Sequence, residues 1–183
     1  MGVAAILLAS GYGRRYGSNK LLDTWEGVPL YRRALEVLPL DRLDRAVVVS
    51  QYGEVLAEAG RLGCLPVLNC HPWEGISASI RLGLLAAKDA GGALFAVCDQ
   101  PNLTTSSIIK LLNAFEESPD RIHALAFQGK KGNPVIFPKA LYPELMALSG
   151  DTGGSAVIRA HRDLLTLTEV SDPAELVDVD VPG

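Results

Sequence analysis

The stretch VAAILLASGYGRRYGSNKLL, residues 3–22, joins an apolar run to a basic, glycine-rich segment. Residues 3–8 lack polar alternation, which is typical of a strand buried on both faces of a sheet. The segment that follows contains three glycines, two arginines and a lysine before residue 21, and no acidic residue. In an α/β sheet, ligands bind beyond the carboxyl ends of the strands. The first strand therefore delivers the basic segment to the place where an anionic ligand would bind.

Apolar strand-like runs and helical patterns alternate along the rest of the chain. We expect further strands at residues 46–49, 65–68, 93–97, 124–127 and 135–137. We expect helices at residues 30–38, 54–62, 76–90, 106–117, 140–148 and 155–162. Strand followed by helix, repeated several times, predicts a Rossmann-like, doubly wound α/β sheet.

The interval 124–137 departs from this alternation. Gly129, Gly132 and Pro134 join two short strands there and leave no room for a crossover helix, so one of these strands should run antiparallel. The sheet is therefore expected to be mixed and mainly parallel. With 183 residues, 48% of them hydrophobic, the chain can bury one sizeable core, and we expect a single domain over residues 1–183.

The overall composition excludes several classes of protein. The formal net charge of -4 argues against a general nucleic-acid binder, whose affinity depends on a basic face. No apolar stretch approaches the roughly 20 residues that a membrane-spanning helix requires, and the first ten residues lack a signal-peptide pattern. We therefore expect a cytoplasmic protein without nucleic-acid or membrane partners.

The cysteines and tryptophans carry weaker signals. Cys64, Cys70 and Cys98 are odd in number and have no metal-type spacing, so free buried thiols are expected. Trp25 and Trp73 fit either a cover over a ring-shaped ligand or, the interpretation that we favour, an anchor in the core or in a loop.

The basic segment matches neither of two familiar phosphate-binding loops. A Walker loop has four residues between its glycines, whereas five separate Gly11 from Gly17 and three separate Gly13 from Gly17. The dinucleotide fingerprint requires a glycine where Tyr16 stands. A solvated surface turn fits this composition too. The density of cations nevertheless exceeds what a diphosphate held by backbone amides requires, and it suits a triphosphate that releases pyrophosphate.

Residues 8–22, LASGYGRRYGSNKLL, resemble the L-A-A-G-x-G-x-R-M-G-x-x-K signature of the molybdenum cofactor nucleotidyltransferase family. Ser10 and Tyr16 depart from it at a small residue and at the methionine. The further matching blocks are NCHPWEGISASIRLGL at 69–84, VCDQP at 97–101, GKKGNPVIF at 129–137, SGDTGGSAVI at 149–158 and VDVDVP at 177–182. Together they are most similar to the molybdopterin cytidylyltransferase branch. The resemblance implies a sheet of the nucleotide-diphospho-sugar transferase type.

The resemblance also implies roles for individual residues of the first loop. The expected nucleotide-binding residues are Leu8, Ala9, Ser10, Gly11, Gly13, Arg15 and Lys20. Arg15 and Lys20 are expected to act in catalysis together with Asp99, because cations near the leaving pyrophosphate neutralise the charge that develops on it.

Residues 75–84 are expected to contact the base and ribose. Related cytidylyltransferases use an S-[VI]-x-x-G-L motif there, and Ser79, Ile80, Gly83 and Leu84 match it. Gly75 would let the backbone approach a ring edge, and the Ser79 hydroxyl can both donate and accept a hydrogen bond. The residues alone also fit an amphipathic helix whose small side chains permit close packing.

Two separate carboxylates are candidates for a metal site. Asp99 follows a predicted strand, and Asp178 and Asp180 alternate with valines, which places both on one face of an extended segment. An aspartate before Gln-Pro is also a common turn former, and a C-terminal acidic pair also fits a solvated tail. The resemblance implies that Asp99 and Asp180 hold Mg²⁺, which prefers carboxylate, phosphate and water oxygens.

The function implied by the resemblance is transfer of CMP from CTP to the terminal phosphate of molybdopterin or molybdenum cofactor, with release of pyrophosphate. The expected partners are CTP or another nucleoside triphosphate, the pterin cofactor, and a client molybdenum hydroxylase. The alternatives are guanylyl transfer to the same cofactor, nucleotidyl transfer to a sugar phosphate, and a noncatalytic carrier or maturation factor for the cofactor. Ser10 and Asn19 stand where the guanylyl branch usually has glycine and aspartate, which favours cytidylyl transfer.

Overall fold

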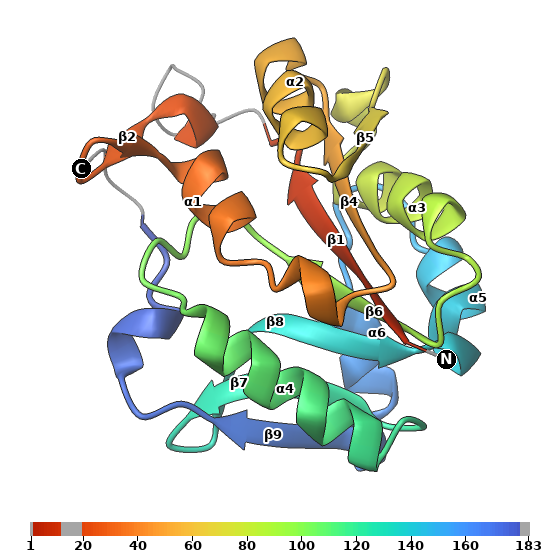
Figure 1. The fold of residues 1–183 in the computed structure, drawn as a ribbon. Helices are drawn as coiled ribbons and strands as arrows, with labels where there is room; N and C mark the ends of the chain where they lie inside the picture. The colour runs from red at the N-terminus through yellow and green to blue at the C-terminus, as the bar shows by residue number, and fades with distance from the viewer. Residues whose placement is uncertain (1, 12–19, 180–183) are drawn as a thin grey trace.

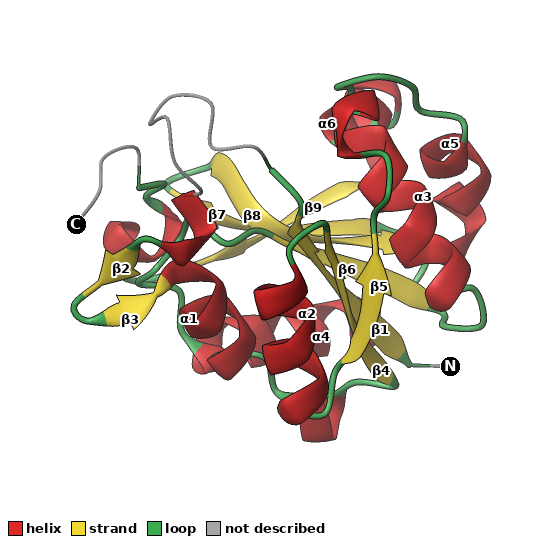
Figure 2. Ribbon diagram, turned by 90° about the horizontal axis from the view of Figure 1, so that it is seen from above, coloured by secondary structure: helices red, strands yellow, loops and turns green. Residues whose placement is uncertain are grey.

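The computed structural model describes residues 2–11 and 20–179, and within them a sheet is covered by helices on both faces (Figure 1, Figure 2). The order of the strands in this sheet is β5-β4-β1-β6-β8-β7-β9. Its strands are β1 (Val3–Ala9), β4 (Arg45–Ser50), β5 (Leu65–Leu68), β6 (Gly92–Ala96), β7 (Ile122–Phe127), β8 (Lys130–Pro138) and β9 (Leu165–Glu169). The α-helices are α1 (Leu30–Glu36), α2 (Gly53–Arg61), α3 (Ile76–Ala86), α4 (Thr105–Glu117), α5 (Tyr142–Met146) and α6 (Ser155–Ala160).

Strand β1 forms the centre of the parallel part of the sheet. It pairs in parallel with β4 on one side and with β6 on the other, and β4 pairs in parallel with β5. The continuous apolar run predicted for β1 is buried along nearly its whole length, as expected for a strand covered on both faces. The carboxyl ends of β1, β4 and β6 consequently meet at one edge of the sheet.

The predicted mixed sheet is confirmed by β8, which runs antiparallel to both β6 and β7. Strand β9, which we did not expect, pairs in parallel with β7 at the border of the sheet. Its sequence alternates between leucine and threonine, a period-two pattern typical of a partly exposed strand. A second small sheet, formed by β2 (Thr24–Trp25) and β3 (Val28–Pro29), was not expected either.

Two buried clusters occupy the two faces of the large sheet. One contains side chains of α1, α2 and α4, and the other contains side chains of α3, α5 and α6. Figure 2 shows the same division of the helices between the two faces. On α3, Gly83 lies so close to Ile6 of β1 that a β-carbon would overlap the Ile6 side chain. Part of the glycine and serine content of α3 therefore serves close helix-to-sheet packing.

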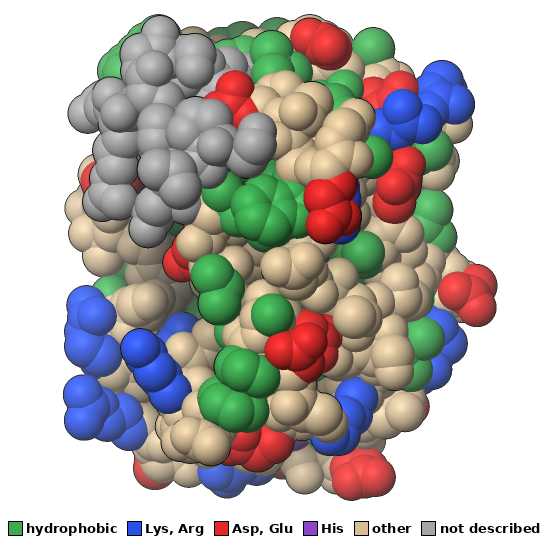
Figure 3. Space-filling view, turned by 90° about the vertical axis from the view of Figure 1, so that its left-hand side faces the viewer, with side chains coloured by type: hydrophobic (Ala, Val, Ile, Leu, Met, Phe, Trp, Pro, Cys, Tyr) green, Lys and Arg blue, Asp and Glu red, His purple; other side chains and the backbone are tan. Residues whose placement is uncertain are grey.

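The composition predicted no membrane-spanning helix and three buried thiols, and the structure differs at one of the thiols. Acidic and basic side chains are interspersed on the face shown in Figure 3. None of the helices within residues 2–11 and 20–179 combines the length and apolar character needed to cross a bilayer. The three cysteines are free, but Cys70 is exposed, so the expectation that all three are buried is wrong. Cys70 lies in the loop after β5, where no layer covers it.

A buried carboxylate fixes the C-terminal segment to the rest of the fold. Glu175 lies in the 3₁₀ helix η6 (Pro173–Leu176) and is only 7% exposed. It accepts hydrogen bonds from the Thr104 backbone N–H at 3.0 Å, the Thr104 hydroxyl at 2.7 Å and the Ser107 hydroxyl at 3.0 Å. Thr104 is the N-cap of α4, so the carboxylate also lies at the positive end of the helix dipole.

Replacing Glu175 with alanine should lower the free energy of unfolding by about 1 to 3 kcal/mol, because the buried Ser107 hydroxyl and the two part-buried donors of Thr104 lose their acceptor. Urea denaturation of the wild type and the variant measures this difference. Glu117→Ala on the exposed end of α4 is the matched control, and its effect should stay within about 0.5 kcal/mol. Equal losses for the two variants would mean that Glu175 anchors nothing.

Candidate functional site

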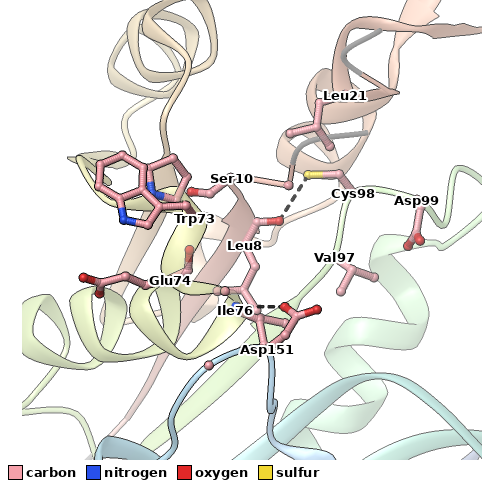
Figure 4. Close-up of a pocket in the computed structure, with 15 residues that line it drawn as sticks. Leu8, Ser10, Leu21, Trp73, Glu74, Ile76, Val97, Cys98, Asp99 and Asp151 are labelled. Carbon is pink, nitrogen blue, oxygen red and sulfur yellow. Dashed lines mark hydrogen bonds between the residues drawn. The ribbon is translucent and has the colours of Figure 1, made fainter. Parts of the chain in front are cut away.

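A cavity of about 530 Å³ opens at the carboxyl edge of β1 and β6 (Figure 4). Leu8, Ser10 and Gly11 contribute to its wall from the end of β1, and Val97, Cys98 and Asp99 contribute from the end of β6. The remaining described wall consists of Leu21, Pro72, Trp73, Glu74, Gly75, Ile76, Ser79, Gly150 and Asp151. Six predicted site residues thus share one cavity: Leu8, Ser10, Gly11, Gly75, Ser79 and Asp99.

The beginning of the first loop is held by residues that follow β4. The Ser50 hydroxyl donates to the Ala9 carbonyl at 2.7 Å, and the Gln51 side-chain amide donates to the Ser10 carbonyl at 2.7 Å. The Tyr52 hydroxyl donates to the Gly11 carbonyl at 2.6 Å. Ala9 itself is fully buried and is not part of the described cavity wall. The residues that follow β4 thus fix the backbone at positions 9–11.

Several predicted residues lie outside the described part of the chain. Gly13, Arg15 and Asp180 fall in residues 12–19 and 180–183, and so do Tyr16 and Asn19. Lys20 is the first residue of the 3₁₀ helix η1 (Lys20–Leu22), and of this lysine the structure describes the backbone alone. The cationic part of the predicted site therefore remains a prediction from the sequence.

Asp99 lies at the edge of the cavity, immediately after the buried Cys98. Its carbonyl accepts a hydrogen bond from the Val179 backbone N–H at 2.7 Å. The hydrogen bonds of Glu175 and this bond of Val179 together hold the C-terminal segment beside Asp99. Asp99 and Val179, which are far apart in the sequence, are thus adjacent. The predicted second carboxylate, Asp180, lies outside the described residues.

The start of α3 is tied to the loop that follows α5. The Ser77 backbone N–H and hydroxyl both donate to the Gly150 carbonyl, at 3.2 and 2.7 Å, and the Ile76 N–H donates to the Asp151 carboxylate at 3.2 Å. Gly75 has a φ of +88°, and a β-carbon there would lie 2.5 Å from backbone atoms of Gly150. Glycine at position 75 is therefore required by this close approach of two backbone segments, a reason that the sequence did not reveal.

Ser79 faces the cavity from α3, and its side chain has a fixed orientation. It is 3% exposed, and its hydroxyl oxygen accepts a hydrogen bond from the Asn69 side-chain amide at 3.1 Å. Asn69 is itself held by the His71 backbone N–H, which donates to its side-chain carbonyl at 2.9 Å. The Ser79 hydroxyl keeps its own proton for a ligand. Asn69 is a positioning residue that sequence reasoning missed, because its partner is ten residues away.

Trp73 is more exposed than we expected from the sequence. It lies in the 3₁₀ helix η3 (Pro72–Glu74), is 64% exposed and forms part of the cavity wall. Its ring meets that of His71 edge to face, with 5.1 Å between the centroids. Of the core or loop anchor that we favoured, the structure excludes the core, because a buried anchor would not leave most of an indole in solvent, and places Trp73 in a loop segment. An aromatic surface at the mouth of the cavity is available to a ring-shaped ligand.

The described wall of the cavity is rich in carboxylates, with Glu74, Asp99 and Asp151 all contributing. Burial, reinforced by the charge of Asp99, raises the pKa of the Cys98 thiol well above its usual range. Cys98 is therefore held as a neutral thiol, which donates to the Leu8 carbonyl at 3.8 Å. The donors that remain are oxygens, which fit Mg²⁺. Within the described residues no cluster of three or more metal-binding side chains occurs.

Comparison with known proteins places this site in a family. The family model of the MobA-like NTP transferase domain matches residues 5–164. The chain is 33% identical to a molybdenum cofactor guanylyltransferase from Rhodobacter capsulatus, over 81% of this chain and 75% of that protein. It is 28% identical to a nicotine blue oxidoreductase from Paenarthrobacter nicotinovorans, over 97% of this chain and 92% of that protein.

The fold comparison agrees with the sequence comparison. The crystal structure of Rv0371c from Mycobacterium tuberculosis H37Rv superposes with a TM-score of 0.78 at 21% identity, covering 98% of this chain and 94% of that one. The matched family segment includes the ends of β1 and β6, α3 and the loop at Gly150, which together form the described cavity. The chain belongs to the MobA-like NTP transferase domain family.

Proposed function

We propose that the protein transfers CMP from CTP to the terminal phosphate of molybdopterin or of the molybdenum cofactor and releases pyrophosphate. The observation that carries this proposal is the cavity of about 530 Å³, which joins the start of the glycine-rich loop, Ser79 and Asp99 at one edge of the sheet. This volume suits a nucleotide-sized ligand, and the position is the one at which α/β sheets bind nucleotides.

The chemistry of the transfer requires positioning and charge neutralisation rather than a protein nucleophile. An oxygen of the acceptor phosphate attacks the α-phosphorus of CTP, a new P–O bond forms, and the bond from the α-phosphorus to the bridging oxygen of pyrophosphate breaks. Mg²⁺, when bound, neutralises phosphate charge and aligns the reacting groups. Asp99 would hold the ion on the protein side. Arg15 and Lys20, on the sequence evidence, would receive the pyrophosphate.

Ser10 supports a pyrimidine in the cavity, and Ser79 offers a contact to it. Ser10 stands where the guanylyl branch usually has a glycine, and its hydroxyl is fixed by donation to the Val49 carbonyl at 3.2 Å. A fixed side chain at this position reduces the space for the base. Ser79, oriented by Asn69, offers a hydroxyl donor to the O2 or N3 acceptor of cytosine.

The proposal is tested by measuring pyrophosphate release with molybdopterin, Mg²⁺ and each of CTP, GTP, UTP and ATP. We expect turnover with CTP and a loss of about 100-fold or more in Asp99→Asn, because the metal loses a charged ligand. Asp120→Asn, an exposed change in the turn before β7, is the control and should retain wild-type turnover.

The other outcomes of this assay separate the alternatives. A preference for GTP would make the protein a guanylyltransferase, and a sugar phosphate as the required acceptor would move it to that branch. Nucleotide or pterin binding without pyrophosphate release would support the carrier.

Nucleotide binding should also change the fluorescence of Trp73, because the base is expected to cover its exposed ring. Titration of CTP with Mg²⁺ should quench the wild type and Trp25→Phe but leave Trp73→Phe unchanged. Trp73→Ala should weaken CTP binding by about five-fold, the amount expected from losing about 1 kcal/mol of ring stacking. Undiminished quenching in Trp73→Phe would contradict this placement of the base.

A further inference from the structure

A second, smaller cavity of about 160 Å³ adjoins the one described above. Leu8, Ile76 and Val97 belong to the walls of both cavities. Its walls are mostly apolar and come from the sheet and from α3, α5 and α6. A volume this small is below the usual range for a complete cofactor, so the cavity can enclose only one end of such a molecule.

Strand β8 gives this cavity a polar end and an apolar end. Lys131, Asn133, Val135 and Phe137, which are alternate residues of β8, all belong to its wall. The cavity wall therefore changes along β8 from a cation and an amide to a valine and a phenylalanine. A ligand with an anionic end and a flat or apolar body would match this gradient.

The polar end of β8 lies at the same edge of the sheet as Asp99. Phe95 of β6 pairs with Val135 of the antiparallel β8. Asp99 lies four residues after Phe95, and Lys131 lies four residues before Val135. Because the two strands run in opposite directions, both displacements lead toward the same sheet edge. The polar end of the smaller cavity therefore faces the reaction side, and its apolar end lies deeper.

Lys131 is poorly compensated in the described structure. It is half-buried, and burial lowers the pKa of its ammonium group. Its backbone pairs with β7, but within residues 2–11 and 20–179 no group accepts a hydrogen bond from its ammonium group or forms an ion pair with it, and the described wall of the smaller cavity contains no carboxylate. A partly desolvated cation gains most from an anion that reaches it inside the cavity. The neighbouring cavity, by contrast, contains Glu74, Asp99 and Asp151.

We propose that the smaller cavity is the acceptor subsite and that Lys131, assisted by Asn133, binds the phosphate monoester of a ring-bearing acceptor. This proposal rests on the nucleotidyl transfer proposed above and names how the chain holds the second substrate. The ring end packs against Val135 and Phe137, and the phosphate end lies toward Asp99 and the nucleotide. Lys131 thereby directs the acceptor phosphate toward the α-phosphorus.

Binding of a fluorescent phosphate monoester tests this without turnover. The protein is first saturated with Mg²⁺ and α,β-methylene-CTP, which cannot release pyrophosphate, so that the nucleotide site and its cationic loop are occupied. 4-Methylumbelliferyl phosphate, a two-ring phosphate monoester, is then titrated and its fluorescence anisotropy is measured. Lys131→Met should weaken binding by about tenfold or more, the effect of losing one charge-assisted hydrogen bond.

The controls separate the charge from the fold. Lys130→Met changes the exposed neighbour on β8, which is not part of the cavity wall, and should bind the probe like the wild type. 4-Methylumbelliferone, which lacks the phosphate, should not distinguish wild type from Lys131→Met. The melting temperature of Lys131→Met should equal or exceed that of the wild type, because a partly desolvated charge has been removed. Wild-type affinity of Lys131→Met for the phosphorylated probe, or absence of probe binding to the wild type, would overturn the proposal.

A kinetic measurement links the subsite to the reaction. With the pterin acceptor, Lys131→Met should lower kcat/KM for the acceptor by about tenfold or more while the dissociation constant for CTP stays unchanged. Failure of nucleotidyl transfer in the wild type would refute the proposed function but leave the probe result intact. Unchanged acceptor kcat/KM in Lys131→Met, with transfer present, would refute the subsite alone.

Discussion

The contact between the start of α3 and the loop after α5 determines the shape of both cavities. Gly75 adopts a left-handed backbone conformation and lies against the Gly150 backbone with no room for a side chain. Ser77 and Ile76 then bind the Gly150 carbonyl and the Asp151 carboxylate. The loop continues from the wall of the larger cavity, at positions 150 and 151, to that of the smaller one, at positions 153–155. A shift of this contact would alter both sites together.

The reversal of direction at β8 complements this contact. A wholly parallel sheet brings only the carboxyl ends of its strands to the binding edge. Because β8 is antiparallel to β6, its amino end reaches the same edge. Asp99 therefore arrives from the end of one strand and Lys131 from the beginning of its neighbour. The mixed sheet thus supplies a carboxylate and a cation at adjacent positions while keeping their apolar continuations, Phe95 and Val135, paired in the core.

The sequence predicted those parts of the fold and site that follow from local pattern. Buried runs such as that of β1 are continuously apolar, which is a clear local signal, and the two glycines and proline before residue 135 correctly indicated the antiparallel strand. Strand β9 was missed because its alternating pattern is short and half-polar. Asn69 was missed because its hydrogen bond to Ser79 cannot be recognised from residue spacing. The exposure of Trp73 cannot be recognised from residue spacing either.

The sequence motifs named residues of the site but did not show why each residue is needed. Ser79 and Asp99, which the motifs named, line one cavity, but the motifs could not reveal that Gly75 is required by a neighbouring loop. The resemblance covered Lys131 within a longer block without distinguishing it from Lys130. Their difference follows from the register of β8, which puts one lysine in a cavity wall and leaves the other in solvent.

The distribution of charge connects the two proposed substrates. A nucleoside triphosphate entering beside Glu74, Asp99 and Asp151 meets three carboxylates, so its binding requires cations from elsewhere. The basic residues at 14, 15 and 20 and a metal ion are the available sources, which explains why an acidic chain concentrates cations in one short segment. In the proposed reaction the acceptor phosphate needs a separate cation, because those of the loop would be engaged by the leaving pyrophosphate. Lys131 meets that requirement from a strand that the nucleotide does not use, so each of the two anions can be held without competing for the other's counter-charge.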